Sequence, residues 1–407
     1  MNVTVNSNLE AIADNWQLSK ANFLDEARKE LNLAQTIHIT DCTLRDGEQQ
    51  AGIAFSWQDK VAIARALDSL GIYEIEVGTP ASSAEDEKAA REIVKMRPKV
   101  KISALARATK GDIDLLSDIG VWGANISLPI GDLQRQHKLK WDEQRYIDTC
   151  LELVAYARNK GLHVNFSPYD TTRADFEFLD RVLTAVKNSG NVDRVRLVDT
   201  VGSSNPIGIR YMVRRMKKIL KDTPLEIHVH DDFGLALANT IAAVEAGADV
   251  ISSTINGIGE RCGNAATEEI VLTLQMLYGI DLGVDCSKLL ETCNLVAELS
   301  GVPISQIKSI VGRNSFSHET GTVVAGVLEI PFTAEPYTPA LVGQQRSFLI
   351  GKKSGKASIV MKLKELNLGE KTPEQLEKIL EQVKIFSITN KRCLEDAEFR
   401  ELVNTVH

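Results

Sequence analysis

The chain has 407 residues, of which 43% are hydrophobic and 25% charged, and its formal net charge is −8. This composition is typical of globular proteins and disfavours disordered, collagen-like and coiled-coil architectures. The acidic balance argues against a nucleic-acid partner, because such proteins normally carry a basic excess or patch. No stretch approaches the roughly 18 consecutive apolar residues of a membrane span, so a membrane role is also disfavoured.

Cysteine usage and the N-terminus indicate a cytoplasmic protein. The N-terminal residues MNVTVNSNLEAIADNW lack a basic region followed by an apolar core, so we expect no secretory signal. Six cysteines without a C-x-x-C pair are too sparse for a disulfide scaffold, which favours a reduced compartment. They are Cys42, Cys150, Cys262, Cys286, Cys293 and Cys393.

Residues 1–35 are polar with scattered apolar positions, and we interpret them as an N-terminal helical arm. The arm could pack on its own domain or reach a neighbouring subunit, and the sequence leaves both open.

From residue 36 to residue 282, short runs rich in Ile and Val alternate with amphipathic stretches of helical period. This alternation predicts parallel strands joined by helices, and about eight such units fit a (β/α)₈ TIM barrel. The rival, an open doubly wound sheet, would carry a G-x-G-x-x-G loop after the first strand, and here that strand ends in LRDGEQQAG. The expected strands are 37–44, 73–80, 101–107, 124–130, 163–170, 194–202, 225–234 and 250–260.

Residues 283–407 are mainly helical in pattern, with a Gly-, Ser- and Pro-containing stretch near 302–355. We expect helical subdomains there, appended to the barrel.

Four polar residues near predicted strand ends suggest a metal site. His228 and His230 alternate along one strand, so they point to the same side. Asp46 follows the first strand, and Asn264 follows the eighth. Active sites of TIM barrels lie where the strands end, so these side chains should converge there. Two imidazoles, a carboxylate and an amide oxygen suit a divalent Lewis acid. Alternatively, the histidines are a core residue and a surface residue, and Asn264 is only a helix N-cap.

Three further polar residues lie at predicted strand ends. Arg45 could stabilise negative charge on a substrate oxygen, or simply form a structural pair with Asp46. Thr200 could hydrogen-bond a substrate carboxylate. Arg107 could attract an acidic substrate, although an ordinary outward salt bridge is nearly as plausible.

The motifs DCTLRDGEQ, EIEVGTPA, LVDTVG, HVHDDFGLALANT, NGIGERCGNA and SHETG together resemble the acyl-CoA-dependent 2-oxoacid condensing enzymes. That family includes homocitrate, 2-isopropylmalate and citramalate synthases. The resemblance extends from about residue 37 to residue 355. The stretch AGIAFSWQDKVAIARALDSLGIYEIEVGTPASSAEDE looks most similar to the short, nitrogen-fixation type of homocitrate synthase.

The resemblance implies a Claisen-type condensation of acetyl-CoA, the co-substrate, with a 2-oxoacid. The product would be of the 2-alkylmalate or homocitrate type, in amino-acid biosynthesis. It implies a divalent metal (Mg, Mn or Zn) held by Asp46, His228, His230 and Asn264, with catalysis assisted by Arg45. The implied substrate-binding residues are Arg107, Asn165, Ser167 and Thr200.

In that family the histidine of the S-H-x-x-G motif is an acid–base group supplied by a partner subunit. It corresponds to His318, followed here by Glu319, so the resemblance implies a catalytic pair and a homodimer. An imidazole titrates in the range this role needs. A surface loop histidine is the alternative.

This chain departs from the family pattern around the substrate. Tyr169 stands where the family carries a catalytic Glu, and Asn165 stands where lysine-pathway homocitrate synthases carry an Arg. Tyrosine cannot be an anionic base at neutral pH, because its usual pKa is about 10. Val323 and Ala325 replace a His and an Asp, and Lys353 replaces a His. We expect retained condensation chemistry with an altered substrate shell.

The sequence leaves several functions open. Isopropylmalate, citramalate, benzylmalate and phosphonomethylmalate synthesis are alternatives within the class. A lyase or aldolase using the same metal is another, and a non-catalytic oxoacid-binding barrel is a third.

Overall fold

The computed structural model of the chain describes residues 4–5 and 15–406. Their contacts divide the described chain into two compact units, which we call the barrel unit and the second unit. The barrel unit contains residues 4–5 and 20–303, and the second unit contains residues 15–19 and 304–406. No helix in the described ranges is both long and apolar enough to cross a membrane.

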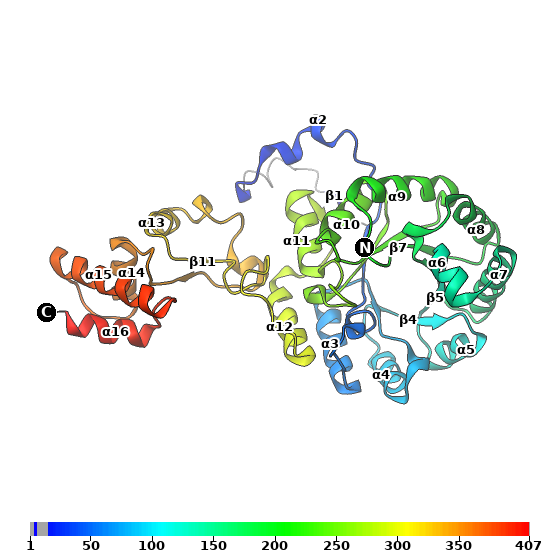
Figure 1. The fold of residues 1–407 in the computed structure, drawn as a ribbon, viewed down its shortest axis with the longest axis horizontal. Helices are drawn as coiled ribbons and strands as arrows, with labels where there is room; N and C mark the ends of the chain where they lie inside the picture. Colours follow the sequence, from blue (N-terminus) through cyan, green and yellow to red (C-terminus); the bar gives the residue numbers. More distant parts are fainter. Residues whose placement is uncertain (1–3, 6–14, 407) are drawn as a thin grey trace. The chain divides into compact units, whose positions relative to one another are not determined.

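Eight parallel strands close into a barrel in the barrel unit, in chain order, with the last strand bonded to the first (Figure 1). This is the predicted TIM barrel. The register places His38 beside Val250 and Asp41 beside Ser253 where the barrel closes. The strands are β2 (His38–Asp41), β3 (Glu74–Glu76), β4 (Lys101–Arg107), β5 (Gly123–Pro129), β6 (His163–Tyr169), β7 (Arg194–Asp199), β8 (Leu225–Val229) and β9 (Val250–Ser253).

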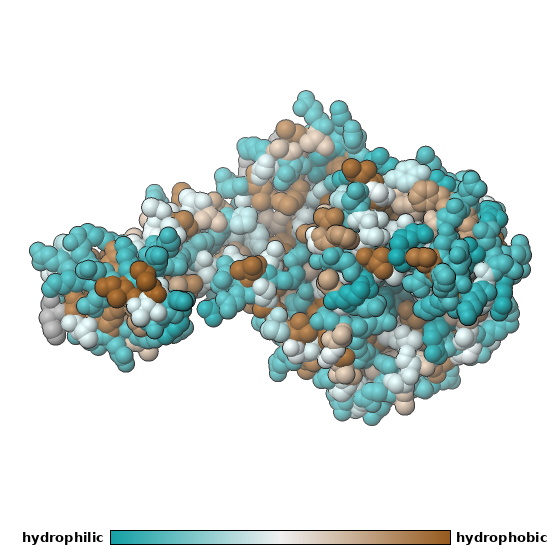
Figure 2. Space-filling model, viewed as in Figure 1, coloured by the Kyte–Doolittle hydropathy of each residue, from teal (hydrophilic) through white to brown (hydrophobic). Residues whose placement is uncertain are grey.

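Amphipathic helices surround the strands, with apolar faces buried on the sheet. In α8 the buried residues Phe178, Leu179 and Val182 recur at helical spacing, while Figure 2 shows mainly hydrophilic residues over the outer face of α7 and α8. The helices are α3 (Trp57–Leu70), α4 (Ala84–Lys95), α5 (Lys110–Ile119), α7 (Glu143–Asn159), α8 (Phe176–Asn188), α9 (Pro206–Leu220), α10 (Ala236–Glu245) and α11 (Thr267–Leu277).

Local signals in the sequence explain where these helices begin and end. A capping box at Ser56 starts α3: its hydroxyl accepts from the Asp59 N–H, and the Asp59 side chain accepts from the Ser56 N–H. Gly71 ends the same helix at a φ of 88°, a left-handed conformation that glycine adopts without a steric penalty.

The barrel unit extends beyond residue 282, the expected end of the barrel. Helix α12 (Leu289–Ser300) packs on α3 and belongs to this unit, which ends at Pro303. The pattern after residue 282 therefore contains one more barrel-covering helix before the second unit begins.

The expected N-terminal arm lies partly outside the described residues, which omit 1–3 and 6–14. The described part has little helix: β1 (Thr4–Val5) pairs with β10 (Ile280–Asp281), and α2 spans only Asp25–Arg28. Arg28 donates a 3.2 Å hydrogen bond to the carbonyl of Tyr278. Residues 20–35 therefore pack on their own barrel unit.

The second unit is mainly helical, as expected. Its helices are α13 (Gly321–Glu329), α14 (Lys356–Glu365), α15 (Pro373–Asn390) and α16 (Asp396–Thr405). A two-stranded parallel sheet pairs β11 (Ser317–His318) with β12 (Ser347–Phe348). Helices α14 to α16 enclose a core that includes Ile359, Ile379 and Phe399.

Candidate metal centre and active site

A cavity of about 630 Å³ opens at the carboxyl ends of the barrel strands. Residues from separate strand ends line it, among them Arg45 after β2, Ser167 in β6, Thr200 after β7 and His228 in β8. This is the end of a TIM barrel at which active sites form.

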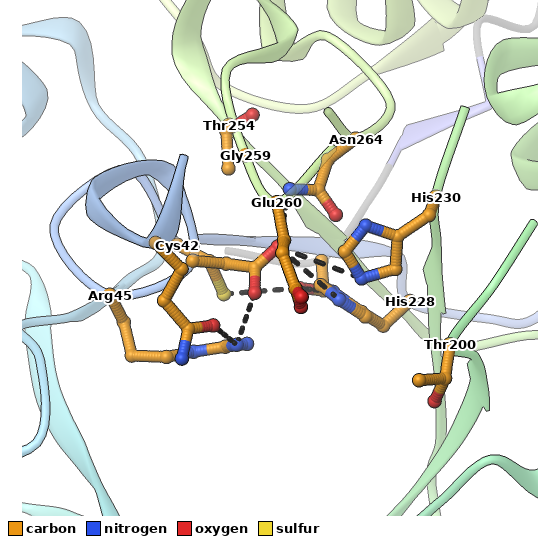
Figure 3. Close-up of polar contacts among 12 residues, drawn as sticks. Cys42, Arg45, Thr200, His228, His230, Thr254, Gly259, Glu260 and Asn264 are labelled. Atoms are coloured by element: carbon orange, nitrogen blue, oxygen red, sulfur yellow. Dashed lines mark hydrogen bonds and ion pairs between the residues drawn. The ribbon is translucent and has the colours of Figure 1, made fainter. Parts of the chain in front are cut away.

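Asp46, His228 and His230 form a buried cluster in this cavity. One ligand atom from each lies within 4.8 Å of the others, and the three residues are at most 4% exposed. The Nε2 atoms of both histidines lie 3.8 Å from the Asp46 carboxylate. Figure 3 shows both imidazoles directed toward one space, as the strand alternation predicts.

Asn264 completes the predicted set of four. Its Nδ2 donates to the Asp46 carboxylate at 2.5 Å, and its buried Oδ1 has no hydrogen-bond partner among the described residues. A buried amide oxygen without a partner is costly unless a ligand satisfies it. A Cβ at Gly259 would lie only 2.0 Å from the Asn264 Nδ2, so the glycine is what lets this side chain approach Asp46. The donor set and the unsatisfied oxygen fit a divalent cation.

The protonation states also suit a cation. Burial disfavours the charged form of Asp46, but Arg45, the two histidines and the Asn264 amide together outweigh burial and lower the pKa of this carboxyl to about 2. Burial lowers the pKa of His228 well below its ordinary value, so its imidazole is neutral at pH 7. An ionised carboxylate and a neutral imidazole are the forms that bind metals.

Arg45 is held at the edge of the cluster by two carboxylates. Its Nη1 donates to Asp46 at 2.7 Å, and its Nε donates to Glu76 at 2.5 Å. The side chain is 9% exposed and lines the cavity. The Arg45–Asp46 pair that the sequence left open therefore exists. It also holds the Arg45 guanidinium so that its positive charge faces the cavity.

Thr200 and Ser167 line the cavity, while Arg107 is engaged elsewhere. The Thr200 hydroxyl accepts from the backbone N–H of Asp170 at 2.7 Å, so its own proton is available to a ligand. Arg107 borders the cavity but donates to Asp112 at 2.8 and 3.1 Å, with a side chain 57% exposed. It forms the outward salt bridge considered as the alternative.

Tyr169 lies at the cavity wall beside a cation that sequence reasoning missed. Lys138, in a π-helical turn spanning Arg135–Leu139, donates to the Tyr169 hydroxyl at 2.9 Å. Single π-helical turns are often found at functional sites.

Asn165 is not among the residues that line the cavity. It is 2% exposed, and its Nδ2 donates to Glu226 at 2.7 Å inside the barrel. The structure therefore places it beneath the site, in a layer of paired charges.

This interior layer, which we call the charged core, was also missed. Arg194 forms ion pairs with Glu74 and Glu226, and Arg196 forms ion pairs with Glu76 and Glu226, at N–O distances of 2.7–2.9 Å. The charged residues alternate along β3 and β7, and that alternation was a usable signal in the sequence.

His318 and Glu319 belong to the second unit. The Nε2 of His318 lies 3.0 Å from the carboxylate of Glu335, which accepts two 2.6 Å hydrogen bonds from Arg346. Burial opposes ionisation of Glu335, but Arg346 and His318 together outweigh burial and lower the pKa of this carboxyl. Glu319 instead accepts from the backbone N–H of Lys353 at 2.8 Å. Glu335 and Arg346 carry no motif that could have marked them in the sequence.

Comparisons with known proteins agree with this architecture. Residues 36–296 match the family model described as HMGL-like, and residues 310–391 match the homocitrate synthase post-HMGL domain-like model. The chain is 41% identical to homocitrate synthase AksA of Methanopyrus kandleri, over 94% of this chain and 96% of that one. It is 40% identical to 2-isopropylmalate synthase 2 of Caldanaerobacter subterraneus subsp. tengcongensis, over 91% and 96% of the two chains.

One solved structure that resembles this chain aligns with about two thirds of it. The hydroxymethylglutaryl-CoA lyase of Pseudomonas aeruginosa aligns with a TM-score of 0.59 and 24% identity, covering 67% of this chain and 96% of that one. At this identity the likeness supports the fold.

Proposed function

The chain belongs to the HMGL-like family, alongside homocitrate and 2-isopropylmalate synthases, and from this premise we propose that it condenses acetyl-CoA with a 2-oxoacid. A base removes a proton from the acetyl methyl carbon, and a new bond joins this carbon to the 2-oxo carbon, whose oxygen takes up a proton. Water then hydrolyses the thioester and releases CoA. The observation that carries the proposal is the buried cluster of Asp46, His228 and His230 beside the unpartnered oxygen of Asn264.

In this proposal the four residues hold a divalent metal ion, Mg, Mn or Zn. When bound, the ion supplies Lewis-acid polarisation of the 2-oxo group. Arg45, fixed by Glu76 and Asp46, stabilises negative charge that develops on the substrate oxygen. Thr200 donates its free hydroxyl proton to the substrate carboxylate, and Ser167 lines the same cavity.

We assign the acid–base step to His318. The Glu335 carboxylate lies 3.0 Å from its Nε2 and holds the imidazole ring in place. The proposal includes a homodimer in which His318 of one protomer serves the barrel of its partner. Glu319 acts as a positioning residue, because its carboxylate accepts a hydrogen bond from the backbone N–H of Lys353.

A homocitrate-type product is the leading candidate, and isopropylmalate-, citramalate-, benzylmalate- and phosphonomethylmalate-type products are the alternatives. Tyr169 and Lys138 at the cavity wall are the residues to vary when the substrate is known. The six cysteines are all free, in keeping with a cytoplasmic enzyme.

The test is a substrate panel. Purified protein with Mg²⁺ or Mn²⁺, acetyl-CoA and single 2-oxoacids is assayed for thiol release. We expect oxoacid-dependent release of CoA that EDTA abolishes and excess metal restores. Absence of CoA release with every oxoacid contradicts the proposal. CoA release that needs no oxoacid indicates thioester hydrolysis, and formation of acetyl-CoA from a hydroxyacyl-CoA indicates a lyase.

A further inference from the structure

The two histidines of the cluster are oriented by different kinds of partner. The Nδ1 of His230 lies 3.2 Å from the carbonyl oxygen of Gly263. A carbonyl can only accept, so this contact by itself places the proton of a neutral His230 on Nδ1. The Nδ1 of His228 instead lies 2.8 Å from the hydroxyl of Ser252. A hydroxyl can donate or accept, so a further partner must decide the tautomer of His228.

That further partner is Cys42. Its sulfur lies 3.0 Å from the Ser252 hydroxyl and 3.6 Å from the Glu76 carboxylate. Ser252 and Cys42 are 1% and 0% exposed, so solvent does not compete for these bonds. Ser252 is also the register partner of His228 across β8 and β9, which fixes the short distance between them.

The Glu76 carboxylate decides which group donates in each hydrogen bond that links it, through Cys42 and Ser252, to His228. Glu76 is ionised and also accepts from Arg45, Arg196 and Asn125, so it can act only as an acceptor. A thiol proton directed at this anion is favoured over a sulfur lone pair directed at it. With its one proton on the Glu76 side, Cys42 accepts from the Ser252 hydroxyl. Ser252 then accepts from His228, whose proton must lie on Nδ1.

We propose that the buried chain Glu76–Cys42–Ser252 fixes His228 as its Nδ1–H tautomer and so keeps Nε2 free to bind the divalent ion. The inference rests on the metal site of the proposed function and assigns positioning roles to Ser252 and Cys42. Second partners of this kind orient metal-binding histidines and raise their basicity. Here the partner is the Ser252 hydroxyl, and its orientation is set by Glu76 through Cys42.

The first experiment reads the tautomer directly in the metal-free protein. Long-range ¹H–¹⁵N spectra of protein labelled with ¹⁵N-histidine distinguish protonated from unprotonated ring nitrogens, and His228→Gln assigns the signals. We expect Nδ1 of His228 to carry the proton in the wild type and in Cys42→Ser, which keeps an O–H donor. In Cys42→Ala we expect a mixture of tautomers. A proton on Nε2 in the wild type overturns the inference.

The second experiment measures Mn²⁺ affinity by calorimetry without either substrate. We expect Ser252→Ala to weaken binding by about 10- to 100-fold, Cys42→Ala to weaken it less, and Cys42→Ser to restore it. The matched control is Ser253→Ala, on the same strand. Ser253 is equally buried, but its hydroxyl bonds Thr267 at 2.8 Å, away from the metal cluster.

The outcomes separate the inference from the proposed function. Wild-type protein that binds no Mn²⁺ refutes the metal site. The tautomer measurement still decides whether the hydrogen bonds from Glu76 through Cys42 and Ser252 place the His228 proton on Nδ1. Mn²⁺ binding that Ser252→Ala weakens no more than Ser253→Ala does refutes the positioning role alone.

Discussion

Two layers of the same barrel bury charged groups in opposite ways. In the charged core, the carboxylates of Glu74, Glu76 and Glu226 bond Arg194 and Arg196. In the mouth above, Asp46 faces two histidines and an amide whose buried oxygen has no partner among the described residues. The three carboxylates of the core are balanced by Arg194, Arg196 and Arg45, whereas the Asn264 oxygen in the mouth is left for a ligand.

The comparison separates buried polar groups that support the fold from those that carry function. A self-paired layer should affect stability when one member is removed, whereas an incomplete layer should affect ligand binding. Mutations in the charged core should therefore lower the free energy of unfolding, and mutations in the mouth should weaken ligand binding.

The largest effect is expected in the mouth. His228→Ala removes one of the proposed metal ligands, so turnover should fall to background because the 2-oxo group would no longer be polarised. Metal-dependent CoA release is the measurement, with thermal unfolding as the control for folding. Near-normal turnover would remove His228 from the metal site.

Variants of His318 test whether a second copy of the chain supplies part of the active site. His318→Ala should lower turnover by about 10²- to 10⁴-fold by removing the acid–base group, with little change in metal affinity. Co-expression of the His228→Ala and His318→Ala chains should restore part of the activity, since a mixed dimer has one intact pairing. No restoration argues against a shared site, and an unchanged turnover in His318→Ala argues against the acid–base role.

The charged core should respond through stability. Glu226→Ala leaves Arg194 and Arg196 each with one fewer carboxylate in a buried layer, so the free energy of unfolding should fall by about 3–5 kcal/mol. Denaturant unfolding measures it. Asp118→Ala breaks an exposed pair with Arg91 and should cost less than about 1 kcal/mol. Equal effects of the two variants would contradict the comparison.

Asp41 is a buried carboxylate of a third kind, bonded to the Thr43 N–H and the Thr267 hydroxyl. Burial raises its pKa from 3.8 to about 7. Between these values the folded chain keeps a proton that the unfolded chain has lost, so stability should fall as pH rises from about 4 to 7. Asp41→Asn should reduce that fall, by at most about 4 kcal/mol at 1.4 kcal/mol per pKa unit. Denaturant unfolding at pH 5 and pH 8 measures the difference, and identical pH dependence in both proteins contradicts the assignment.

Much of the fold was predictable because its signals are local. Strand and helix alternation predicted the barrel, and the spacing of His228 and His230 predicted that both side chains point to one side at the end of β8. Histidine is a familiar ligand, so its alternation was noticed. The same alternation of Glu74 with Glu76 and of Arg194 with Arg196 was visible in the sequence, but which charge meets which depends on barrel closure.

Other features had no local signal. Asn165 occupies a family substrate position, yet its amide bonds Glu226 because β6 places it one layer below the mouth. Lys138, Glu335 and Ser252 acquire partners 17–31 residues away in sequence, and those partners become neighbours only in the folded chain.

At the opposite end of the barrel, Lys101 lies between two aromatic rings. Its ammonium is 4.5 Å from the ring centre of Tyr73 and 4.3 Å from that of Trp122, and it donates to the Tyr73 hydroxyl at 2.6 Å. Lys101, these two rings and the charged core lie below the cavity, which opens at the carboxyl ends of the strands. Under the proposed function, substrate and product would pass through this same opening, so product that remains in the cavity would delay binding of the next substrate.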